Sequence, residues 1–337
     1  MSERAQIEND LEHFRAEWDD PSPYMTVQTS GSTGTPKQMR VLKERMRASA
    51  RLTCQFLGLK KGDTALLCMP LRYIAGKMVV VRALEWRLKL LVREPSGHPL
   101  AEPFDGDLDF AAMIPLQVYN SLQVPAERER LTRIRHLIIG GGAIDRELEA
   151  ALRPFPNRIY STYGMTETLS HVAMRRLNGP EASEYYEPFP SVQLSLSPDQ
   201  TLVIDAPLVC DGPLVTNDVV DLQPDGRFRV IGRKDNIINS GGVKIQIETV
   251  EAKLRPFLTV PFAITALPDP KFGEAIVLLT TAEATAFPPE ALDRYERPKQ
   301  ILRVEAIPMT GSGKIDRAAC RRLAIETNEC QTSKSKR

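Results

Sequence analysis

The chain has 337 residues, of which 42% are hydrophobic and 26% are charged, and its formal net charge at pH 7 is +1. This composition is ordinary for a soluble globular protein, and the length suffices for two domains with cores of their own. The near-zero net charge argues against a nucleic-acid-binding surface, so we expect no nucleic acid partner.

Cysteine usage and the apolar segments indicate a cytoplasmic protein. The five cysteines are scattered without the spacing of metal ligands, which is typical of free thiols in a reducing compartment. The first residues, Met1 to Arg4, lack the basic and apolar regions of a signal peptide. The most apolar helical run, 78–84, contains Arg82 and is too short to span a bilayer, so we expect no membrane insertion.

Strand-like and helix-like segments alternate through the first half of the chain. Predicted strands cover 24–28, 64–69, 88–92, 110–114, 135–139 and 158–161. Predicted helices cover about 43–58, 76–87, 115–122 and 145–152. This alternation is typical of an α/β fold with a mainly parallel sheet covered by helices. Ligands of such sheets bind outside the carboxyl ends of the strands.

The pattern changes to hairpins in the second half. Segments 195–205 and 221–231 are predicted as hairpins with Pro- and Asp-containing turns, and a small α+β module follows. Its predicted helices lie near 248–254 and 316–324, and its predicted strands cover 262–266 and 275–281. We place one domain at 1–234, a second at 235–327 and a disordered tail at 328–337.

Residues 29–37 are rich in hydroxyl groups and glycine and end in Pro36 and Lys37. Glycine lets backbone N–H groups turn towards an anion, hydroxyl groups add donors, and lysine adds a positive charge. The segment is not a Walker loop, and the Pro-Lys ending argues against a flexible linker. The residues expected to bind phosphate are Thr29, Ser30, Ser32, Thr33, Thr35 and Lys37.

Two further segments follow predicted strands. Gly140, Gly141 and Gly142 would let a flat ligand approach the backbone, although taken alone they are more simply a tight turn. The segment 163–168 offers an aromatic ring, a hydroxyl group and a carboxylate within a few residues. These groups could stack on a base, contact a phosphate and hold Mg²⁺.

Polar residues of the second half add two weaker signals. Asp218 has a carboxylate suited to ribose hydroxyl groups, and Arg233 follows in the hairpin region. Lys314 lies in the glycine-containing run Thr310-Gly311-Ser312-Gly313-Lys314. Individually these are ordinary surface residues, as most lysines are.

Taken together and in this order, the segments resemble the motifs of the adenylate-forming superfamily of acyl-CoA ligases, adenylation domains and luciferases. The resemblance covers roughly residues 27–323. It implies a large domain with mainly parallel sheets and a β-hairpin subdomain, and a small mobile α+β domain. It also implies a two-step reaction with ATP, Mg²⁺ and CoA, in which a small-molecule carboxylate forms an acyl-adenylate and a thiol then displaces AMP.

The resemblance implies roles for the residues named above. The 30–37 loop would hold the β- and γ-phosphates, and Tyr163 would stack on adenine beside the three glycines. Thr166 would contact the α-phosphate and Glu167 would bind Mg²⁺. The ribose would be fixed by Asp218 and Arg233.

Two more roles concern the two half-reactions. Lys314 would bridge the substrate carboxylate and the α-phosphate, where negative charge accumulates in the transition state. The small domain would swing about Asp235, which would remove Lys314 and bring residues 240–242 to the thiol tunnel.

The acyl site is suggested by Arg82, which lies six residues after Gly76 of a Pro-Leu-Arg-Tyr-Ile-Ala-Gly run. Burying an unpaired arginine is costly, and a surface arginine with a packed stem is the alternative. The o-succinylbenzoate–CoA ligases of menaquinone synthesis are similar, because they carry an arginine at this spacing and use a dicarboxylate. The resemblance therefore implies that Arg82 binds the second carboxylate.

His171 could line the acyl pocket, with a structural histidine as the alternative. Tyr73 stands where the family has a histidine that is a proposed gate, which puts that role in doubt. Ala75 and Ile247 replace a family serine and proline, and few residues precede the phosphate loop, as in compact ligases of menaquinone synthesis.

Three other functions stay open: another aryl- or acyl-CoA ligase, an enzyme that loads a carrier protein, and an inactive nucleotide-binding scaffold. The presence of Lys314, Glu167, Asp218 and Arg233 argues against the scaffold. We make no prediction of the oligomeric state.

Overall fold

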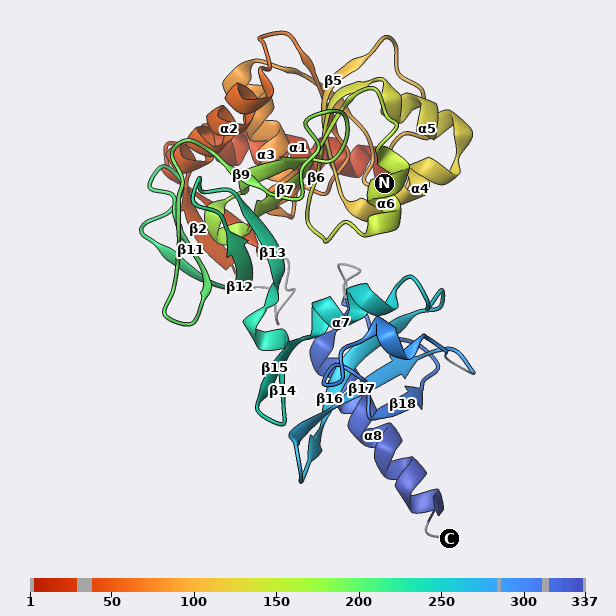
Figure 1. Cartoon of the computed structure of the whole chain (residues 1–337). Helices are drawn as coiled ribbons and strands as arrows, with labels where there is room; N and C mark the ends of the chain where they lie inside the picture. The colour runs from red at the N-terminus through yellow and green to blue at the C-terminus, as the bar shows by residue number, and fades with distance from the viewer. Residues whose placement is uncertain (1–2, 29–37, 284–285, 311–314, 336–337) are drawn as a thin grey trace. The chain divides into compact units, whose positions relative to one another are not determined.

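The computed structural model describes residues 3–28, 38–283, 286–310 and 315–335, and the chain divides into two units (Figure 1). Unit 1 comprises Met1–Ser195, Val203–Leu214 and Leu222–Arg229. Unit 2 comprises Leu196–Leu202, Val215–Asp221 and Val230–Arg337. The domain boundary predicted at Asp235 falls in the last of these segments and stays a prediction.

The core of unit 1 is a seven-stranded sheet of order β4-β3-β5-β6-β7-β8-β9. Its strands are β3 (Thr64–Leu67), β4 (Lys89–Val92), β5 (Leu108–Met113), β6 (Ile134–Ile139), β7 (Arg158–Gly164), β8 (His171–Arg176) and β9 (Glu187–Pro188). The five strands β4, β3, β5, β6 and β7 pair in parallel in that order, and β8 and β9 add antiparallel pairs. The predicted α/β architecture with a mainly parallel sheet is therefore confirmed.

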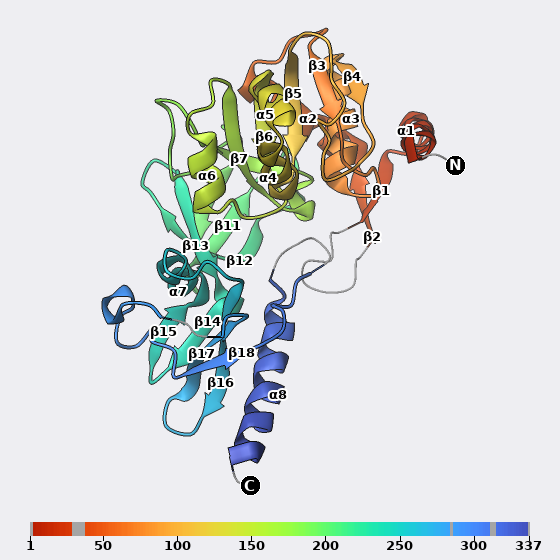
Figure 2. The same cartoon turned by 90° about the vertical axis from the view of Figure 1, so that its right-hand side faces the viewer.

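Helices cover both faces of this sheet. They are α2 (Lys43–Leu57), α3 (Ile74–Trp86), α4 (Pro115–Gln123), α5 (Pro125–Thr132) and α6 (Arg146–Leu152). Helices α2 and α3 lie on one side, and α4, α5 and α6 lie on the other (Figure 2). Burial on both faces explains why the strands read as continuous apolar runs.

Helix α1 (Glu3–Asp19) precedes the predicted elements. Ile7, Leu11, Phe14 and Trp18 are buried and recur at the spacing of one helix face, so the helix packs through a single apolar stripe. No helix of the described residues is long and apolar enough to cross a membrane.

Two antiparallel sheets accompany the main one. Strands β1 (Tyr24–Gln28) and β2 (Gln38–Leu42) form a ribbon in which Gln28 pairs with Gln38. A four-stranded sheet has the order β10-β11-β12-β13. Its strands are β10 (Gln193–Leu196), β11 (Thr201–Asp205), β12 (Leu214–Leu222) and β13 (Phe228–Arg233). The two predicted hairpins are thus present.

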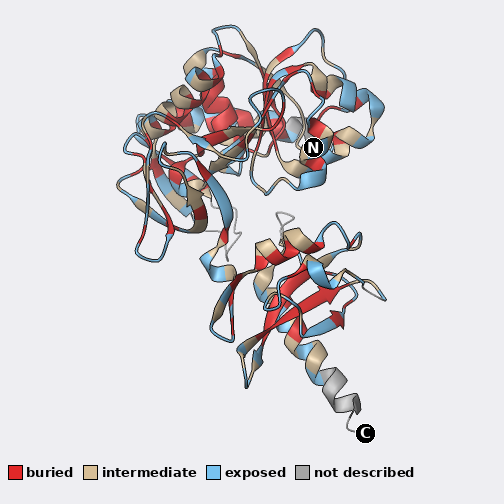
Figure 3. Ribbon diagram, viewed as in Figure 1, coloured by how far each residue is buried: buried red, intermediate tan, exposed pale blue. Residues whose placement is uncertain are grey.

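Unit 2 contains a five-stranded sheet with one helix on each face. The elements are β14 (Ile237–Ser240), β15 (Val243–Gln246), α7 (Ile247–Leu254), β16 (Phe262–Asp269), β17 (Gly273–Thr280), β18 (Gln300–Arg303) and α8 (Arg317–Ser335). Alternate residues of β16 and β17 enter two cores, because side chains alternate across a strand. Ile264 and Leu278 pack with α7, whereas Ala263 and Leu279 pack with α8. The buried strands stand out in Figure 3.

Helix α8 is longer than predicted. We expected a helix over 316–324 and a disordered tail from residue 328, whereas the helix extends to Ser335. The segment contains neither glycine nor proline, so nothing in its backbone chemistry stops the helix.

A buried ion pair joins α7 to α8. Arg317 donates to both carboxylate oxygens of Glu251 at 2.5 and 2.8 Å, and Glu251 also accepts the N–H of Ile264. Glu251→Ala should lower the free energy of unfolding by about 3–5 kcal/mol, because it leaves Arg317 and that N–H unpaired. Lys253→Ala, which removes a more exposed pair on the same helix, should cost about 0–1 kcal/mol. The free energies of unfolding are measured by urea denaturation. If the two variants were destabilised equally, the Glu251–Arg317 pair would not be the stronger one.

Candidate active site

The glycine run lies at the carboxyl end of β6, beside the end of β7. Ile139 pairs with Ser161, so Gly140 and Thr162 are neighbours on adjacent strands. A Cβ atom on Gly140 would lie 2.3 Å from Thr162 Oγ1, and Gly141 has a φ of +79°. A side chain at Gly140 would therefore have to displace the hydroxyl of Thr162, and Gly141 holds a left-handed conformation that favours glycine.

Tyr163 is held in an aromatic cluster at the end of β7. Its ring packs edge-on against Phe228 with centroids 4.9 Å apart, and it also contacts Tyr186 at 5.9 Å. The hydroxyl of Tyr186 is hydrogen-bonded to Ser161 at 2.7 Å. These contacts fix the ring of Tyr163, which is half-buried. No sequence signal pointed to Tyr186 or Phe228, because both lie far along the chain.

The turn after Tyr163 is tightly built around Thr168. This buried residue accepts the N–H of Met165 at 2.9 Å and donates to the carbonyl of Ser170 at 2.6 Å. A Cβ atom on Gly164 would lie 2.3 Å from that same carbonyl oxygen, so the chain approaches itself closely here. The turn presents Thr166 and Glu167 on a short 3₁₀ helix, Thr166–Thr168.

The carboxylate of Glu167 is a suitable oxygen ligand for Mg²⁺. It is exposed, and no ion pair engages it within the described residues. Those residues contain no group of three or more metal-binding side chains. Since Mg²⁺ typically takes one or two carboxylates together with substrate phosphates, a single exposed glutamate fits such a site.

Arg82 is buried in unit 1 with 2% of its surface exposed. Within the described residues its only hydrogen bond goes from Nη2 to Ser170 Oγ at 2.7 Å, and its Nε has no partner. Burial lowers the pKa of Arg82 to about 10, a value at which the guanidinium is still charged at neutral pH. The arginine is therefore a buried cation whose charge no described carboxylate balances.

His171 lies beside Arg82 and is also buried. Its Nδ1 is 3.2 Å from Ser170 Oγ and its Nε2 is 3.0 Å from Thr53 Oγ1. Burial first, and then the charge of Arg82, hold the pKa of His171 well below its ordinary value. Both ring nitrogens are thus engaged by protein hydroxyl groups.

Tyr73 immediately precedes α3 and is partly exposed. Its ring packs against the guanidinium of Arg72, 4.9 Å from the centroid. Behind it, Gly76 has no room for a side chain, because a Cβ atom would lie 2.5 Å from the carbonyl oxygen of Pro70. The substrate role of Tyr73 stays a prediction.

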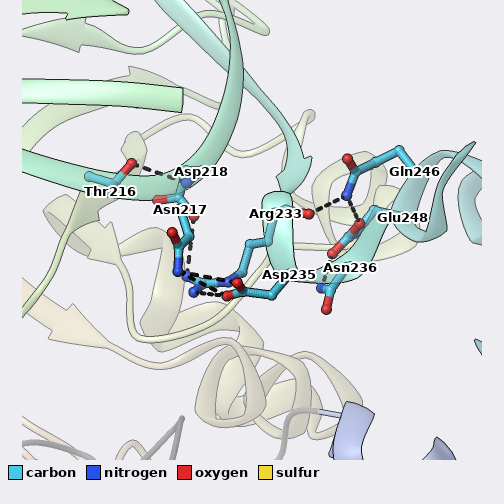
Figure 4. Close-up of polar contacts among 8 residues, drawn as sticks. All are labelled: Thr216, Asn217, Asp218, Arg233, Asp235, Asn236, Gln246 and Glu248. Atoms are coloured by element: carbon cyan, nitrogen blue, oxygen red, sulfur yellow. Dashed lines mark hydrogen bonds and ion pairs between the residues drawn. The ribbon is translucent and has the colours of Figure 1, made fainter. Parts of the chain in front are cut away.

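The residues predicted for ribose and for the hinge lie together in unit 2 (Figure 4). Arg233 contacts Asp218 at 3.4 Å and donates to Asp235 at 2.9 Å. Asn217, which sequence reasoning missed, donates to both carboxylate oxygens of Asp235. Asp235 is therefore held by two partners, and Asp218 lies next to the guanidinium group.

The backbone around Asp235 is fixed from its other side. Gln246 donates to the carbonyl of Arg233 at 2.9 Å, and Glu248 accepts hydrogen bonds from Gln246 and Asn236. A Cβ atom on Gly232 would lie 2.4 Å from the Gln246 side chain. The segment expected to act as a hinge is therefore organised by side chains of β15 and α7.

Two predicted sites lie outside the described residues. They are the phosphate-loop residues, 29–37, and Lys314. Their flanks are described: Gln28 pairs with Gln38, and Met309 pairs with Ile315.

The chain is similar to several known proteins. Residues 2–208 match the family model described as AMP-binding enzyme. An acyl-CoA synthetase (AMP-forming)/AMP-acid ligase II-like protein of Dyadobacter fermentans is 35% identical, with 92% of each chain covered and a TM-score of 0.66. The 2-succinylbenzoate–CoA ligase of Listeria monocytogenes is 25% identical over 89% of this chain and 70% of its own.

A solved structure of lower identity shares the fold. The o-succinylbenzoate coenzyme A synthetase of Bacillus subtilis, in complex with ATP and magnesium ion, is 20% identical with a TM-score of 0.69. The match covers 87% of this chain and 68% of that one. The chain belongs to the AMP-binding enzyme family of adenylate-forming ligases.

Proposed function

We propose that the protein is a 2-succinylbenzoate–CoA ligase that acts in menaquinone biosynthesis. The observation that carries this proposal is Arg82, a buried cation whose charge is unbalanced among the described residues. The names of the relatives support the same substrate, since the ligase of Listeria monocytogenes acts on 2-succinylbenzoate by its name.

The proposed reaction has two steps. An oxygen of the substrate carboxylate attacks the α-phosphorus of ATP, and the bond to the β-phosphate oxygen breaks, which releases pyrophosphate and leaves an acyl-adenylate. The thiolate of CoA then attacks the acyl carbon, and the bond to the adenylate oxygen breaks, which releases AMP. Each step displaces one leaving group, and no oxidant or reductant is needed.

The nucleotide would be bound by residues of known geometry. Tyr163 offers a ring fixed by two aromatic neighbours, on which adenine would stack beside the Gly140–Gly142 backbone. Thr166 would donate to the α-phosphate. Mg²⁺, held by Glu167 and phosphate oxygens, would neutralise phosphate charge when bound.

Arg82 explains why the acid would need two carboxylates. An uncompensated charge in the interior costs free energy, and an anion that binds there recovers that cost. Guanidinium groups bind carboxylates through two parallel hydrogen bonds, and within the described residues Arg82 uses one of its five N–H donors. A diacid can present one carboxylate to Arg82 while the other is activated. The proposed substrate has this form.

The direct test is to incubate the purified protein with ATP, Mg²⁺, CoA and a panel of carboxylic acids that includes 2-succinylbenzoate. AMP and CoA thioesters are measured by mass spectrometry. A thioester formed selectively from 2-succinylbenzoate supports the proposal. AMP without a CoA adduct would instead indicate a carrier-protein thiol, and the absence of both products with every acid would indicate an inactive scaffold.

Asp218→Ala tests the nucleotide site separately. If Asp218 binds the ribose, the change should raise KM for ATP by about tenfold, the effect of losing hydrogen bonds to a charged group. KM for the acid should stay near that of the wild type. A sharper comparison uses 2′-deoxy-ATP: the wild type should prefer ATP, and the variant should have lost most of this preference. A variant that keeps the full preference would contradict the ribose assignment.

A further inference from the structure

Arg82 is the start of a chain of hydrogen-bonded side chains that crosses unit 1. Its Nη2 donates to Ser170 Oγ at 2.7 Å, and that oxygen lies 3.2 Å from Nδ1 of His171. On the other side of the ring, Nε2 lies 3.0 Å from Thr53 Oγ1. Thr53 Oγ1 in turn lies 3.2 Å from the backbone carbonyl oxygen of Ser49. The chain links β8 to helices α3 and α2.

The partners fix the direction of every hydrogen bond. Ser170 Oγ accepts from Arg82, so its own hydrogen goes to Nδ1 of His171, the one acceptor it meets among the described residues. A neutral imidazole with a bare Nδ1 carries its proton on Nε2. Nε2 therefore donates to Thr53, and Thr53 donates to the carbonyl of Ser49.

This order requires a neutral His171. A protonated ring would carry a hydrogen on Nδ1, which would oppose the hydroxyl of Ser170 and place a second positive charge beside Arg82. Burial and the charge of Arg82 hold the pKa of His171 well below its ordinary value, in agreement with the neutral form. The chain ends on a helix carbonyl, whose position is set by the backbone of α2.

We propose that Ser170, His171 and Thr53 are positioning residues that orient Arg82 towards the second carboxylate of the acid. Within the described residues the relay engages one Nη2–H, and the Nε–H of Arg82 has no hydrogen-bond partner. Since none of the three relay residues is charged, the relay orients the guanidinium without neutralising it. This inference rests on the proposed function, because it assumes that Arg82 meets a carboxylate of the substrate.

Thr53 gives the cleanest variants, because it is fully buried at the far end of the relay. Thr53→Val keeps the shape and removes the hydroxyl, whereas Thr53→Ser keeps the hydroxyl and removes a methyl group. If Thr53 only filled space, serine would be the worse replacement. If it anchors the relay, valine would be the worse one.

The kinetic test compares these variants on 2-succinylbenzoate and on 4-oxo-4-phenylbutanoate, which lacks the ring carboxylate. Thr53→Val should raise KM for the diacid by about tenfold, the effect of leaving buried polar groups unpaired. In Thr53→Val, KM for the monoacid and KM for ATP should stay at their wild-type values. In Thr53→Ser, which keeps the hydroxyl, KM for the diacid should also stay at the wild-type value. Ser49→Ala is the matched control, because Ser49 Oγ is buried one turn away and makes no hydrogen bond within the described residues.

A second measurement tests the relay without any substrate. The chain has four histidines, so ¹⁵N spectra of histidine-labelled protein can be assigned with a His171→Asn variant. The wild type should show His171 protonated on Nε2 alone, with no titration near the ordinary histidine pKa. Thr53→Val should change the ring signals, and Ser49→Ala should not. A His171 ring protonated on Nδ1, or one that titrates near the ordinary histidine pKa, would contradict the proposed order of hydrogen bonds.

The two measurements separate failure of the relay from failure of the proposed function. If the wild type makes the CoA thioester of 2-succinylbenzoate but Thr53→Val keeps its KM, the positioning role is wrong and the function stands. If the wild type makes no thioester of a diacid, the proposed function is wrong and the positioning role falls with it, whereas the ¹⁵N spectra still decide the order of the relay.

Discussion

Replacing Arg82 with alanine is expected to raise KM for 2-succinylbenzoate by about a hundredfold, because truncating one member of a buried charge pair costs several kcal/mol. KM for ATP should remain close to the wild-type value, since Arg82 contacts the nucleotide in no part of the proposal. The measurement is a steady-state assay of AMP release at varied acid and varied ATP. An unchanged KM for the acid would remove Arg82 from the substrate site.

Arg82→Met is the matched variant, because methionine is apolar and fills much of the same space. Its KM for 2-succinylbenzoate should rise as it does in Arg82→Ala. It should also be more stable than the wild type in the absence of substrate, since it removes an unbalanced buried charge. A methionine variant that is less stable would mean that the charge is balanced in the folded protein, which would contradict the assignment of an anion site.

Replacing Lys314 with alanine should reduce acyl-adenylate formation by about 100- to 1,000-fold, the usual effect of removing one group that stabilises transition-state charge. Thioester formation from a supplied acyl-adenylate should stay within a few-fold of the wild type, because Lys314 is assigned to the first step alone. Pyrophosphate exchange measures the first step, and CoA thioester formation from the synthetic adenylate measures the second.

Lys299→Ala is the control for Lys314. It removes the same charge from an exposed position, where the ammonium group packs over Phe272 at 5.1 Å. It should leave both half-reactions unchanged. If Lys314→Ala reduced both half-reactions equally, the role assigned to Lys314 would be wrong.

The strands of the unit 1 sheet could be predicted because each leaves a pattern in its own short stretch of sequence. A strand covered on both faces must be apolar along its whole length, so 110–114 and 135–139 are recognisable without their neighbours. Helix α8 was underestimated for a related reason. Its last turns are polar, and polarity alone does not distinguish an exposed helix from a disordered tail.

The candidate site could be predicted only in part, because its support comes from residues far apart in the chain. Arg82 stood out as a charge within an apolar run. Its burial, and the lack of a described carboxylate beside it, depend on how α2 and β8 pack around it. Thr53 and His171 are 118 residues apart, and no local pattern links them. Phe228 likewise reaches Tyr163 only in the folded chain.

The most direct measurement of the central claim is kcat/KM of the wild type for three acids. They are 2-succinylbenzoate and its two analogues that each lack one carboxylate, 4-oxo-4-phenylbutanoate and 2-butyrylbenzoate. We expect kcat/KM for 4-oxo-4-phenylbutanoate to be at least about a hundredfold lower than for the diacid, and we expect most of this difference to vanish in Arg82→Met. 2-Butyrylbenzoate lacks the carboxylate that is activated, so neither the wild type nor Arg82→Met should turn it over. A wild type that uses a monoacid as well as the diacid would contradict the claim that Arg82 selects a second carboxylate.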